Sequence, residues 1–445
     1  MTDSPDKNRP LAIDLGYEEW VSLFERMGQP SYRAGQVTNW LWCRGVSDPA
    51  GMTNLGKPLR EELVRNVDFT VPVVDKEERA RDGTRKFLVS MRDSVRVETA
   101  LLKQGDRLTA CISTQAGCPV GCPFCVTGGA EFERNLSRGE IAYQMILMER
   151  RIGREINNVV LMGMGEPFLN TDESLAAIRM LNDPKLRGLG IRHMTVSTSG
   201  IIPGIRALAD AGLGVRLAVS LHAVDDDLRD ELVPSNTTYP VADLLAAIRD
   251  YQERTGDRVT IEYALFKGKN DSLEQARKLV RALRGIHVYI NLIPANSGRA
   301  GYERSRDEDV LRFQSVLKSA GFESEIRVER GAEINAACGQ LKGAEDVAGR
   351  PERKAEKSPV GTKRPGGEKR KPPQRPRKGD AAAKRDDALS GGRGDAVRPK
   401  GRGRPEREGG DARVSPERPG GKGVGRRQER PRRGGGGPGK PHGRD

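Results

Sequence analysis

The sequence alternates between apolar, strand-like runs and helical stretches from about residue 110 to residue 330. Seven runs have strand character, the last more weakly: TACIST, NNVVLMGM, HMTVSTS, VRLAVSL, RVTIEYALF, HVYINLIP and SEIRVER. The stretches between them carry apolar residues at three- and four-residue spacing, as amphipathic helices do. Alternating units of roughly 30 residues predict parallel strands with right-handed crossovers, in a barrel or an open sheet. Six or so repeats favour an α/β fold with a partial (β/α)6 TIM-like barrel.

The segments before the barrel have a different periodicity. Residues 17 to about 66 read as short amphipathic helices and hold all three tryptophans, which we expect in the core of a small helical module spanning residues 1–68. Between residues 69 and 108 the apolar period approaches two, which predicts a short antiparallel segment. The barrel is then assigned to residues 109–343.

The basic charge of the chain is confined to its C-terminal end. The formal net charge is +14, but residues 351–445 hold 29 Lys and Arg against 13 Asp and Glu, and the rest holds 47 against 49. The same 95 residues contain 21 Gly and 13 Pro. We therefore predict that residues 344–445 form a disordered tail. Sequence-independent RNA binding by this tail and a purely solvated extension both remain open.

The start of the chain does not resemble a secretory signal peptide. The opening MTDSPDKNRPLAIDLG has no apolar h-region, and no stretch approaches the roughly 18 to 20 apolar residues of a membrane span. We therefore expect a cytoplasmic protein without membrane contact. Six cysteines are too few for a disulfide scaffold, and four of them fall within 15 residues. In a reducing compartment this crowding favours metal or redox chemistry.

The crowded cysteines form a CxxxCxxC motif directly after the first strand. Cys118, Cys122 and Cys125 provide three thiols within eight residues, which leaves a fourth ligand position without a local donor. Structural zinc prefers a closed set of four ligands, commonly from two CxxC pairs, and no second pair is present. An iron–sulfur cluster held by three cysteines leaves one iron open to a small molecule. Structural zinc is a serious alternative for such a motif, and an iron–sulfur cluster is favoured chiefly because of the neighbouring motifs.

Polar residues follow several of the predicted strands. They occur in GMGEP, STSG, SLHA and NLIPAN, after the second, third, fourth and sixth strands. Because the carboxyl ends of parallel strands share one face of a barrel, these loops and the cysteine motif are expected to meet in one site.

The motifs together resemble a known family. CxxxCxxC after the first strand of a β/α barrel, with Phe124 before the last cysteine, is similar to the radical S-adenosylmethionine superfamily. From about residue 17 to residue 342 the chain resembles the RlmN/Cfr family of RNA adenine methyltransferases. The strings that carry this resemblance are RVETALL, CISTQAGCPVGCPFCVTGG, RNL, VVLMGMGEP, TVSTSG, AVSLHA, NLIPAN and INAACGQL.

The resemblance implies a cofactor site. Cys118, Cys122 and Cys125 would bind a [4Fe–4S] cluster whose fourth iron takes the amino and carboxylate groups of S-adenosylmethionine. The positions that match the family's contacts to that cofactor are Gly165, Glu166, Ser197, Ser220, Leu221, His222 and Asn296.

The resemblance also implies roles for two further cysteines. Adenine carbon 2 is not nucleophilic, so Cys338 would first take a methyl group from one S-adenosylmethionine. A second molecule, cleaved at the cluster, would give the radical that activates the S-methyl group for addition to adenine. Cys111 would assist proton removal and release the product through a transient disulfide with Cys338. Glu98 matches the family's proton acceptor.

The implied activity is methylation of adenine carbon 2 in 23S ribosomal RNA and in transfer RNAs, by a monomer that takes electrons from a donor such as flavodoxin or ferredoxin. One alternative is Cfr-like methylation at carbon 8, which confers antibiotic resistance. An alternative of another class is a non-enzymatic, zinc-containing RNA-binding protein. Glu131 stands where the family commonly has glycine, and Glu333 where aspartate is usual. Cys43 has no motif around it and is expected to be structural.

Overall fold

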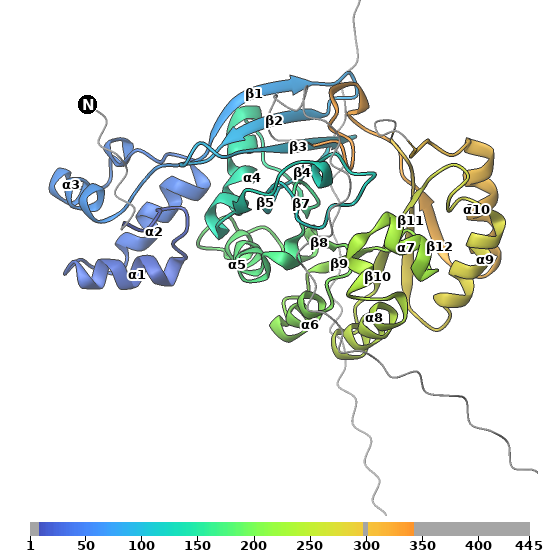
Figure 1. The fold of residues 1–445 in the computed structure, drawn as a ribbon. Coiled ribbons are helices and arrows are strands. Elements are labelled where there is room, and N and C mark those ends of the chain that lie inside the picture. The colour runs from blue at the N-terminus through green and yellow to red at the C-terminus, as the bar shows by residue number, and fades with distance from the viewer. Residues whose placement is uncertain (1–8, 297–300, 342–445) are drawn as a thin grey trace, which may run out of the picture. The chain divides into compact units, whose positions relative to one another are not determined.

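The computed structural model describes residues 9–296 and 301–341, which fall within one compact unit (Figure 1). The predicted disordered tail lies outside the described residues. Ten strands form a single sheet in the order β1-β2-β3-β4-β7-β8-β9-β10-β11-β12. Its strands are β1 (Val73–Arg79), β2 (Arg85–Ser90), β3 (Arg96–Gln104), β4 (Arg107–Cys111), β7 (Asn158–Leu161), β8 (Met194–Thr198), β9 (Arg216–Ser220), β10 (Val259–Leu265), β11 (Val288–Pro294) and β12 (Glu323–Ile326).

The sheet has an antiparallel part and a parallel part. Strands β1 to β4 pair antiparallel, and every pairing from β4 to β12 is parallel. The seven strand-like runs of the sequence are therefore the seven parallel strands, and the antiparallel segment before them is also confirmed. The sheet ends at β1 and β12, and no pairing among the described residues joins these two edges. This open arrangement is consistent with the predicted partial barrel.

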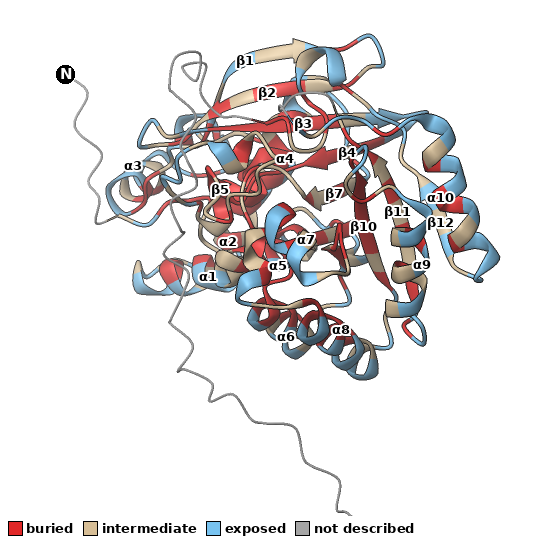
Figure 2. Ribbon diagram, turned by 45° about the vertical axis from the view of Figure 1, so that its right-hand side comes forward, coloured by how far each residue is buried: buried red, intermediate tan, exposed pale blue. Residues whose placement is uncertain are grey.

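Helices connect the parallel strands and cover the sheet (Figure 1). Figure 2 shows buried residues concentrated in the strands, while α6, α8, α9 and α10 present an exposed side. No helix in the described part of the chain is long and apolar enough to cross a membrane. The helices are α1 (Tyr17–Arg26), α2 (Arg33–Thr38), α3 (Lys57–Asn66), α4 (Arg138–Ile152), α5 (Thr171–Asn182), α6 (Ile202–Ala211), α7 (Asp226–Leu232), α8 (Val241–Thr255), α9 (Leu273–Ala282) and α10 (Asp307–Ser319).

Two elements were not predicted from the pattern. Strand β1, VVDKEER, has no buried residue, because it is the edge of the sheet and carries charges that protect such an edge from further pairing. Helix α7, DDLRDEL, is short and acidic and follows the fourth parallel strand. Local hydrophobic periodicity is weak in both segments, so the sequence signal was absent.

The N-terminal helices share the main hydrophobic core with the sheet and its helices, so the expectation of a separate core for this module is wrong. Trp20 and Trp42 are buried, as predicted, but Trp40 is only partly buried and its Nε1 donates to Asn54 Oδ1 at 2.6 Å. The ring of Trp42 packs edge-to-face on Tyr143 of α4, with centroids 5.8 Å apart. Cys43 is exposed, and its sulfur lies 3.3 Å from the carbonyl oxygen of Leu186.

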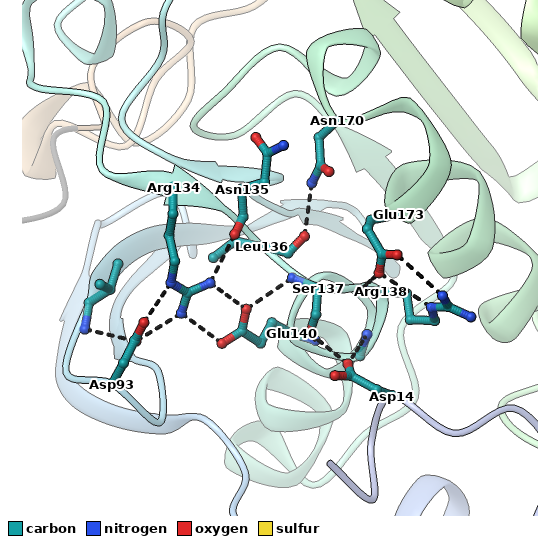
Figure 3. A network of polar contacts seen from close by, with 12 residues as sticks. Asp14, Asp93, Arg134, Asn135, Leu136, Ser137, Arg138, Glu140, Asn170 and Glu173 are labelled. Carbon is teal, nitrogen blue, oxygen red and sulfur yellow. Dashed lines mark hydrogen bonds and ion pairs between the residues drawn. The ribbon is translucent and has the colours of Figure 1, made fainter. Parts of the chain in front are cut away.

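A polar network centred on Arg134 joins the N-terminal segment, the turn after β2 and the start of α4 (Figure 3). The guanidinium of Arg134 donates two hydrogen bonds to Glu140, at 2.7 and 2.8 Å, and two to Asp93, at 2.6 and 2.8 Å. Ser137 caps α4 together with Glu140 and donates to Asp14 Oδ1 at 2.6 Å. Since bidentate pairs fix orientation, this network holds segments far apart in sequence in one geometry.

We predict that Arg134→Met lowers the free energy of unfolding by about 3 kcal/mol, because it leaves the nearly buried Glu140 carboxylate without its cation. Urea unfolding of the cluster-free protein measures this value. A matched control is Arg151→Met, which should cost less than about 1 kcal/mol, because the Arg151 side chain is exposed and its partner Glu77 keeps ion pairs with Arg79 and Arg85. Equal effects of the two substitutions would contradict the assignment of the Arg134 network as a structural joint.

The contribution of the Arg134 network to the free energy of unfolding should depend on pH. Hydrogen bonding to Arg134 lowers the pKa of Asp93 below its ordinary value of 3.8. A depressed carboxyl pKa stabilises the folded state above the unfolded pKa, and this contribution is lost as the pH falls through the folded pKa. The stability difference between wild type and Arg134→Met should therefore be constant near neutrality and shrink below about pH 3.8.

Candidate active site

A cavity of about 600 Å³ lies at the carboxyl ends of the parallel strands. All seven parallel strands, or the loops that follow them, contribute to its wall. This convergence is the geometry that the sequence predicted for the polar loops. The lining includes Cys111 of β4, Gly165 after β7, Ser197 of β8, Ser220 of β9, Glu262 of β10, Asn291 of β11 and Arg327 after β12.

The cysteine loop forms one side of this cavity. Cys118, Cys122 and Cys125 all line it. The loop requires glycine at two positions. Gly117 has φ +78°, in the left-handed region, and a Cβ added at Gly128 would lie 2.7 Å from the carbonyl oxygen of Cys122. The glycines of the motif therefore let the chain fold tightly around the three thiols.

The donor set of this loop fits an iron–sulfur cluster. Burial raises the pKa of Cys118 to about 12, and it also raises the pKa of Cys122 well above its ordinary value. Thiolates at these positions thus need a positive partner, which bound iron supplies. Among the described residues no three Cys, His, Asp or Glu side chains converge as the ligands of a single metal ion do. A cluster does not require such convergence, because each cysteine binds a different iron.

The end of the described chain is attached to the cysteine loop. The Val126 amide donates to the carbonyl oxygen of Gly339 at 2.7 Å, and the Thr127 hydroxyl donates to that of Leu341 at 2.5 Å. From the other side, Asn296 Nδ2 donates to the carbonyl oxygen of Cys338 at 3.0 Å. These bonds bring Cys338 into the wall of the cavity that also holds the three cysteines of the motif.

Cys111 and Cys338 lie in the same cavity, and Ala336, two residues before Cys338, packs against Cys111. All six cysteines are free, so the structure contains no disulfide between them. Burial raises the pKa of Cys111 to about 12, the neighbouring Cys338 also raises it, and Arg327 acts in the opposite direction. Arg327 therefore provides a positive charge beside the two thiols.

The loop after β7 has a constrained backbone and a buried carboxylate. Gly165 has φ +102°, and a Cβ added there would lie 2.7 Å from the Cβ of Gln115. Glu166 accepts hydrogen bonds from the amides of Ser199 at 2.7 Å and Phe168 at 3.0 Å. Burial raises the pKa of this carboxyl group. Glu166 thus links the ends of β7 and β8 while lining the cavity.

His222 is held in an unusual conformation at the cavity wall. Its φ is +59°, one of three positive values among the described residues other than glycine. Its Nδ1 accepts a hydrogen bond from the Ala264 amide at 3.0 Å, which places the proton on Nε2, and its ring meets Phe124 edge-on at 5.3 Å. Burial lowers its pKa to about 3. A neutral imidazole in strained backbone is typical of a functional position.

Most of the sequence-predicted site residues come together, but two do not line the cavity. The Leu221 side chain belongs to the main hydrophobic core. Glu98 is buried on β3, where its carboxylate pairs with Lys86 Nζ at 3.0 Å. All the other predicted site residues line the cavity. They are Cys111, Cys118, Cys122, Cys125, Gly165, Glu166, Ser197, Ser220, His222, Asn296 and Cys338.

Sequence reasoning missed a polar group on the other side of the cavity. Asn291 Nδ2 lies 3.3 and 3.2 Å from the two carboxylate oxygens of Glu262, and Arg327 lies 4.0 Å from the same carboxylate. These residues lie on or directly after the last three parallel strands. The rule that polar residues at strand ends face the site could have found them, but they stand inside strand-like runs without a distinctive motif.

The two departures from the family pattern lie next to the site. The Glu131 backbone packs against Gly117, just before Cys118. The Glu333 carboxylate accepts a hydrogen bond from the Arg81 amide and so attaches the segment before Cys338 to the turn after β1. Both residues support the loops that carry cavity cysteines.

Comparison with known families assigns both parts of the chain. Residues 112–280 match the Radical SAM superfamily, and residues 12–68 match the ribosomal RNA large subunit methyltransferase N-terminal domain. A crystal structure of a radical SAM methyltransferase from Sphaerobacter thermophilus is similar, with a TM-score of 0.73 and 42% identity over 75% of this chain and 99% of that one. The fold is thus that of a radical S-adenosylmethionine methyltransferase.

Curated relatives narrow the assignment. A protein from Thermotoga neapolitana described as “Probable dual-specificity RNA methyltransferase RlmN” is 46% identical over 74% of this chain and 96% of its own length. A protein of the same description from Staphylococcus aureus is 39% identical over 77% of this chain and 95% of its own length. The chain belongs to the RlmN family of RNA methyltransferases.

The burial of Cys111 predicts slow alkylation at neutral pH. With a pKa of about 12, about one Cys111 in ten thousand is a thiolate at pH 8, and the alkylation rate should rise about tenfold per pH unit up to that pKa. Iodoacetamide labelling of the cluster-free protein, followed by peptide mass spectrometry, measures the rate. The exposed Cys43 is the internal control and should react much faster. Equal rates at pH 8 would contradict the environment described for Cys111.

Proposed function

We propose that this protein methylates carbon 2 of an adenine in 23S ribosomal RNA, and of an adenine in transfer RNAs, through a methylated Cys338. The observation that carries the proposal is the meeting of five cysteines in one cavity. Three of them come from one tight loop, and Cys111 and Cys338 come from β4 and from the end of the described chain. A cluster site alone needs only the first three.

The proposal rests on family membership for its substrate class. Relatives described as dual-specificity RNA methyltransferases cover most of this chain, and the match to the N-terminal domain favours the carbon 2 reaction over the Cfr-like reaction at carbon 8. The predicted division at residues 1–68, 69–108 and 109–343 belongs to this proposal. We place the reaction in the cytoplasm, with a monomer that receives electrons from a flavodoxin or a ferredoxin.

The cofactor residues have separate tasks in this scheme. Cys118, Cys122 and Cys125 hold a [4Fe–4S] cluster, which together with S-adenosylmethionine supplies a deoxyadenosyl radical when both are bound. The ends of β7, β8, β9 and β11 bind the S-adenosylmethionine. Glu166 and the neutral His222 offer an acceptor and a donor for it. The remaining predicted contacts are Gly165, Ser197, Ser220, Leu221 and Asn296.

The other two thiols carry the methyl transfer. Adenine carbon 2 is a poor nucleophile, so the chain must present the methyl group on an atom of its own, and the Cys338 sulfur is the accessible candidate in the cavity. Arg327 lies beside both sulfurs, and its positive charge opposes the rise in the pKa of Cys111. Cys111 then assists proton removal and attacks the Cys338 sulfur to release the product. Glu98 acts as a proton acceptor from β3.

The test of this function is the identity of the modified nucleoside. RNA from cells that lack the native enzyme is incubated anaerobically with protein, S-adenosylmethionine and reductant, digested to nucleosides, and separated with mass detection. We expect 2-methyladenosine from both ribosomal and transfer RNA. Formation of 8-methyladenosine would replace the proposal by the Cfr-like activity, and a colourless zinc protein that modifies neither RNA would favour an RNA-binding protein without enzymatic function.

Cys338→Ala should abolish methylation while leaving the iron content unchanged, because Cys338 lies outside the three-cysteine loop. Nucleoside analysis and iron determination on the same preparation measure both effects. Cys43→Ala, the matched control, should keep both activity and iron, because Cys43 is exposed and remote from the cavity lining. Full methylation by Cys338→Ala would rule out a methyl group carried on that residue.

Cys111→Ala should trap the RNA on the protein. Without the second thiol, the bond between Cys338 and the RNA cannot be resolved, so a covalent adduct should accumulate and migrate as a shifted band on a denaturing gel. The double variant Cys111→Ala, Cys338→Ala is the control and should show no such band. Loss of iron from Cys111→Ala would instead show that Cys111 is a cluster ligand.

A further inference from the structure

Arg229 of α7 is completely buried and lies beneath the ends of two cavity strands. Its Nη2 donates to the carbonyl oxygen of Ser199 at 2.7 Å and to that of Ser220 at 3.1 Å. Its Nε donates to the carbonyl oxygen of Leu221 at 3.0 Å, and its Nη1 donates to Asn236 Oδ1 at 2.9 Å. One guanidinium thus joins the ends of β8 and β9, from which Ser197, Ser220 and His222 reach the cavity.

The charge of Arg229 has no direct carboxylate partner within the described residues. All four acceptors named above are uncharged carbonyl or amide oxygens. Asp226 and Asp230 lie one step further away, where their carboxylates accept from the amide of Asn236 at 3.0 and 2.6 Å. Burial lowers the pKa of Arg229 to about 10, so it remains a cation at neutral pH. A buried cation without an anion in contact is costly unless a functional anion approaches it.

The cysteine loop supplies such an anion. Cys122 packs against an apolar cluster that includes Leu232 and Val233, one turn beyond Arg229, and Val233 also lines the cavity. Cys122, a proposed cluster ligand, therefore packs against residues that closely follow Arg229 in the chain.

We propose that Arg229 is a positioning residue that supplies the buried counter-charge of the iron–sulfur cluster and ties the ends of β8 and β9 beside it. The inference rests on the proposed function in so far as a cluster forms on the three cysteines. Three thiolates around a doubly positive [4Fe–4S] core leave one net negative charge, and reduction adds a second. A fixed cation in a medium of low dielectric stabilises the reduced form more than the oxidised form. Removal of this charge should therefore make the cluster harder to reduce.

The experiment compares Arg229→Gln, which removes the charge and retains polar atoms, with Arg229→Lys, which retains the charge and loses the planar hydrogen-bonding geometry. Arg187→Gln is the matched control, since Arg187 is also largely buried but pairs with Glu149 at 2.6 Å and does not line the cavity. Each protein is reconstituted anaerobically. Iron content and the midpoint potential, followed by electron paramagnetic resonance in a dithionite titration, are measured without RNA.

For Arg229→Gln we expect at least a tenfold fall in the equilibrium constant for one-electron reduction, which corresponds to a midpoint about 59 mV more negative. Arg229→Lys and Arg187→Gln should stay within a threefold change of the wild type. Retention of iron by Arg229→Lys, with its loss from Arg229→Gln, would support the same conclusion.

Three results would overturn the inference. Arg229→Gln with the wild-type potential would show that the charge is not felt by the cluster. An equal shift in Arg229→Gln and Arg229→Lys, or loss of iron from both, would show that geometry alone matters. A wild-type protein that binds no iron would overturn both the inference and the cluster on which the proposed function depends. If the wild type binds iron but the midpoint potential of Arg229→Gln is unchanged, only the inference fails and the proposed function stands.

Discussion

The attachment of residues 338–341 to the cysteine loop is the constraint on which the site depends. Two hydrogen bonds, from the Val126 amide and the Thr127 hydroxyl, join segments more than 200 residues apart in sequence. Without them, the parallel strands would still form a cavity with three cysteines, but Cys338 would lose its attachment to the cysteine loop and keep the hydrogen bond from Asn296. The fold therefore provides the cofactor site, and these two bonds bring the proposed methyl carrier to it.

Different charged residues act on different cysteines of this cavity. The thiols of Cys111, Cys118 and Cys122 are buried, and burial alone opposes their ionisation. Two arginines counter this effect: Arg229, behind the wall, acts on Cys122, and Arg327, in the wall, acts on Cys111. Because charge interactions weaken with distance, each cation acts chiefly on its own sulfur group. The proposed cluster ligands and the proposed methyl carrier thus have separate cations near them.

The sequence predicted the scaffold well because the scaffold depends on local patterns. Each of the seven parallel strands is an apolar run that can be recognised from its local sequence, and α4 begins with the capping box of Ser137 and Glu140. Strand β1 and helix α7 were not predicted, because both are rich in charged residues and their apolar residues do not recur at the spacing of a strand or helix that faces a core. The site was predictable in part, because polar residues at strand ends face one edge, but the roles of Cys111 and Cys338 came from family resemblance.

What the sequence could not provide is any contact between distant segments. Arg229 stands among acidic residues in a short helix, where an arginine usually lies on the surface, yet it is fully buried. Glu98 and Leu221 matched family positions, yet their side chains lie outside the cavity lining, in an ion pair with Lys86 and in the core. Such placements follow from how strands and loops pack together, and no local pattern encodes them.

The central claim is that Cys338 carries the methyl group that reaches the RNA. The most direct measurement is peptide mass spectrometry of the iron-loaded protein after exposure to methyl-labelled S-adenosylmethionine and before RNA is added. The account predicts the labelled methyl group on the peptide that contains Cys338, with the Cys111 peptide unmodified, and its disappearance after RNA and reductant are supplied. A label on Cys111, or none on Cys338 while RNA is methylated, would contradict it.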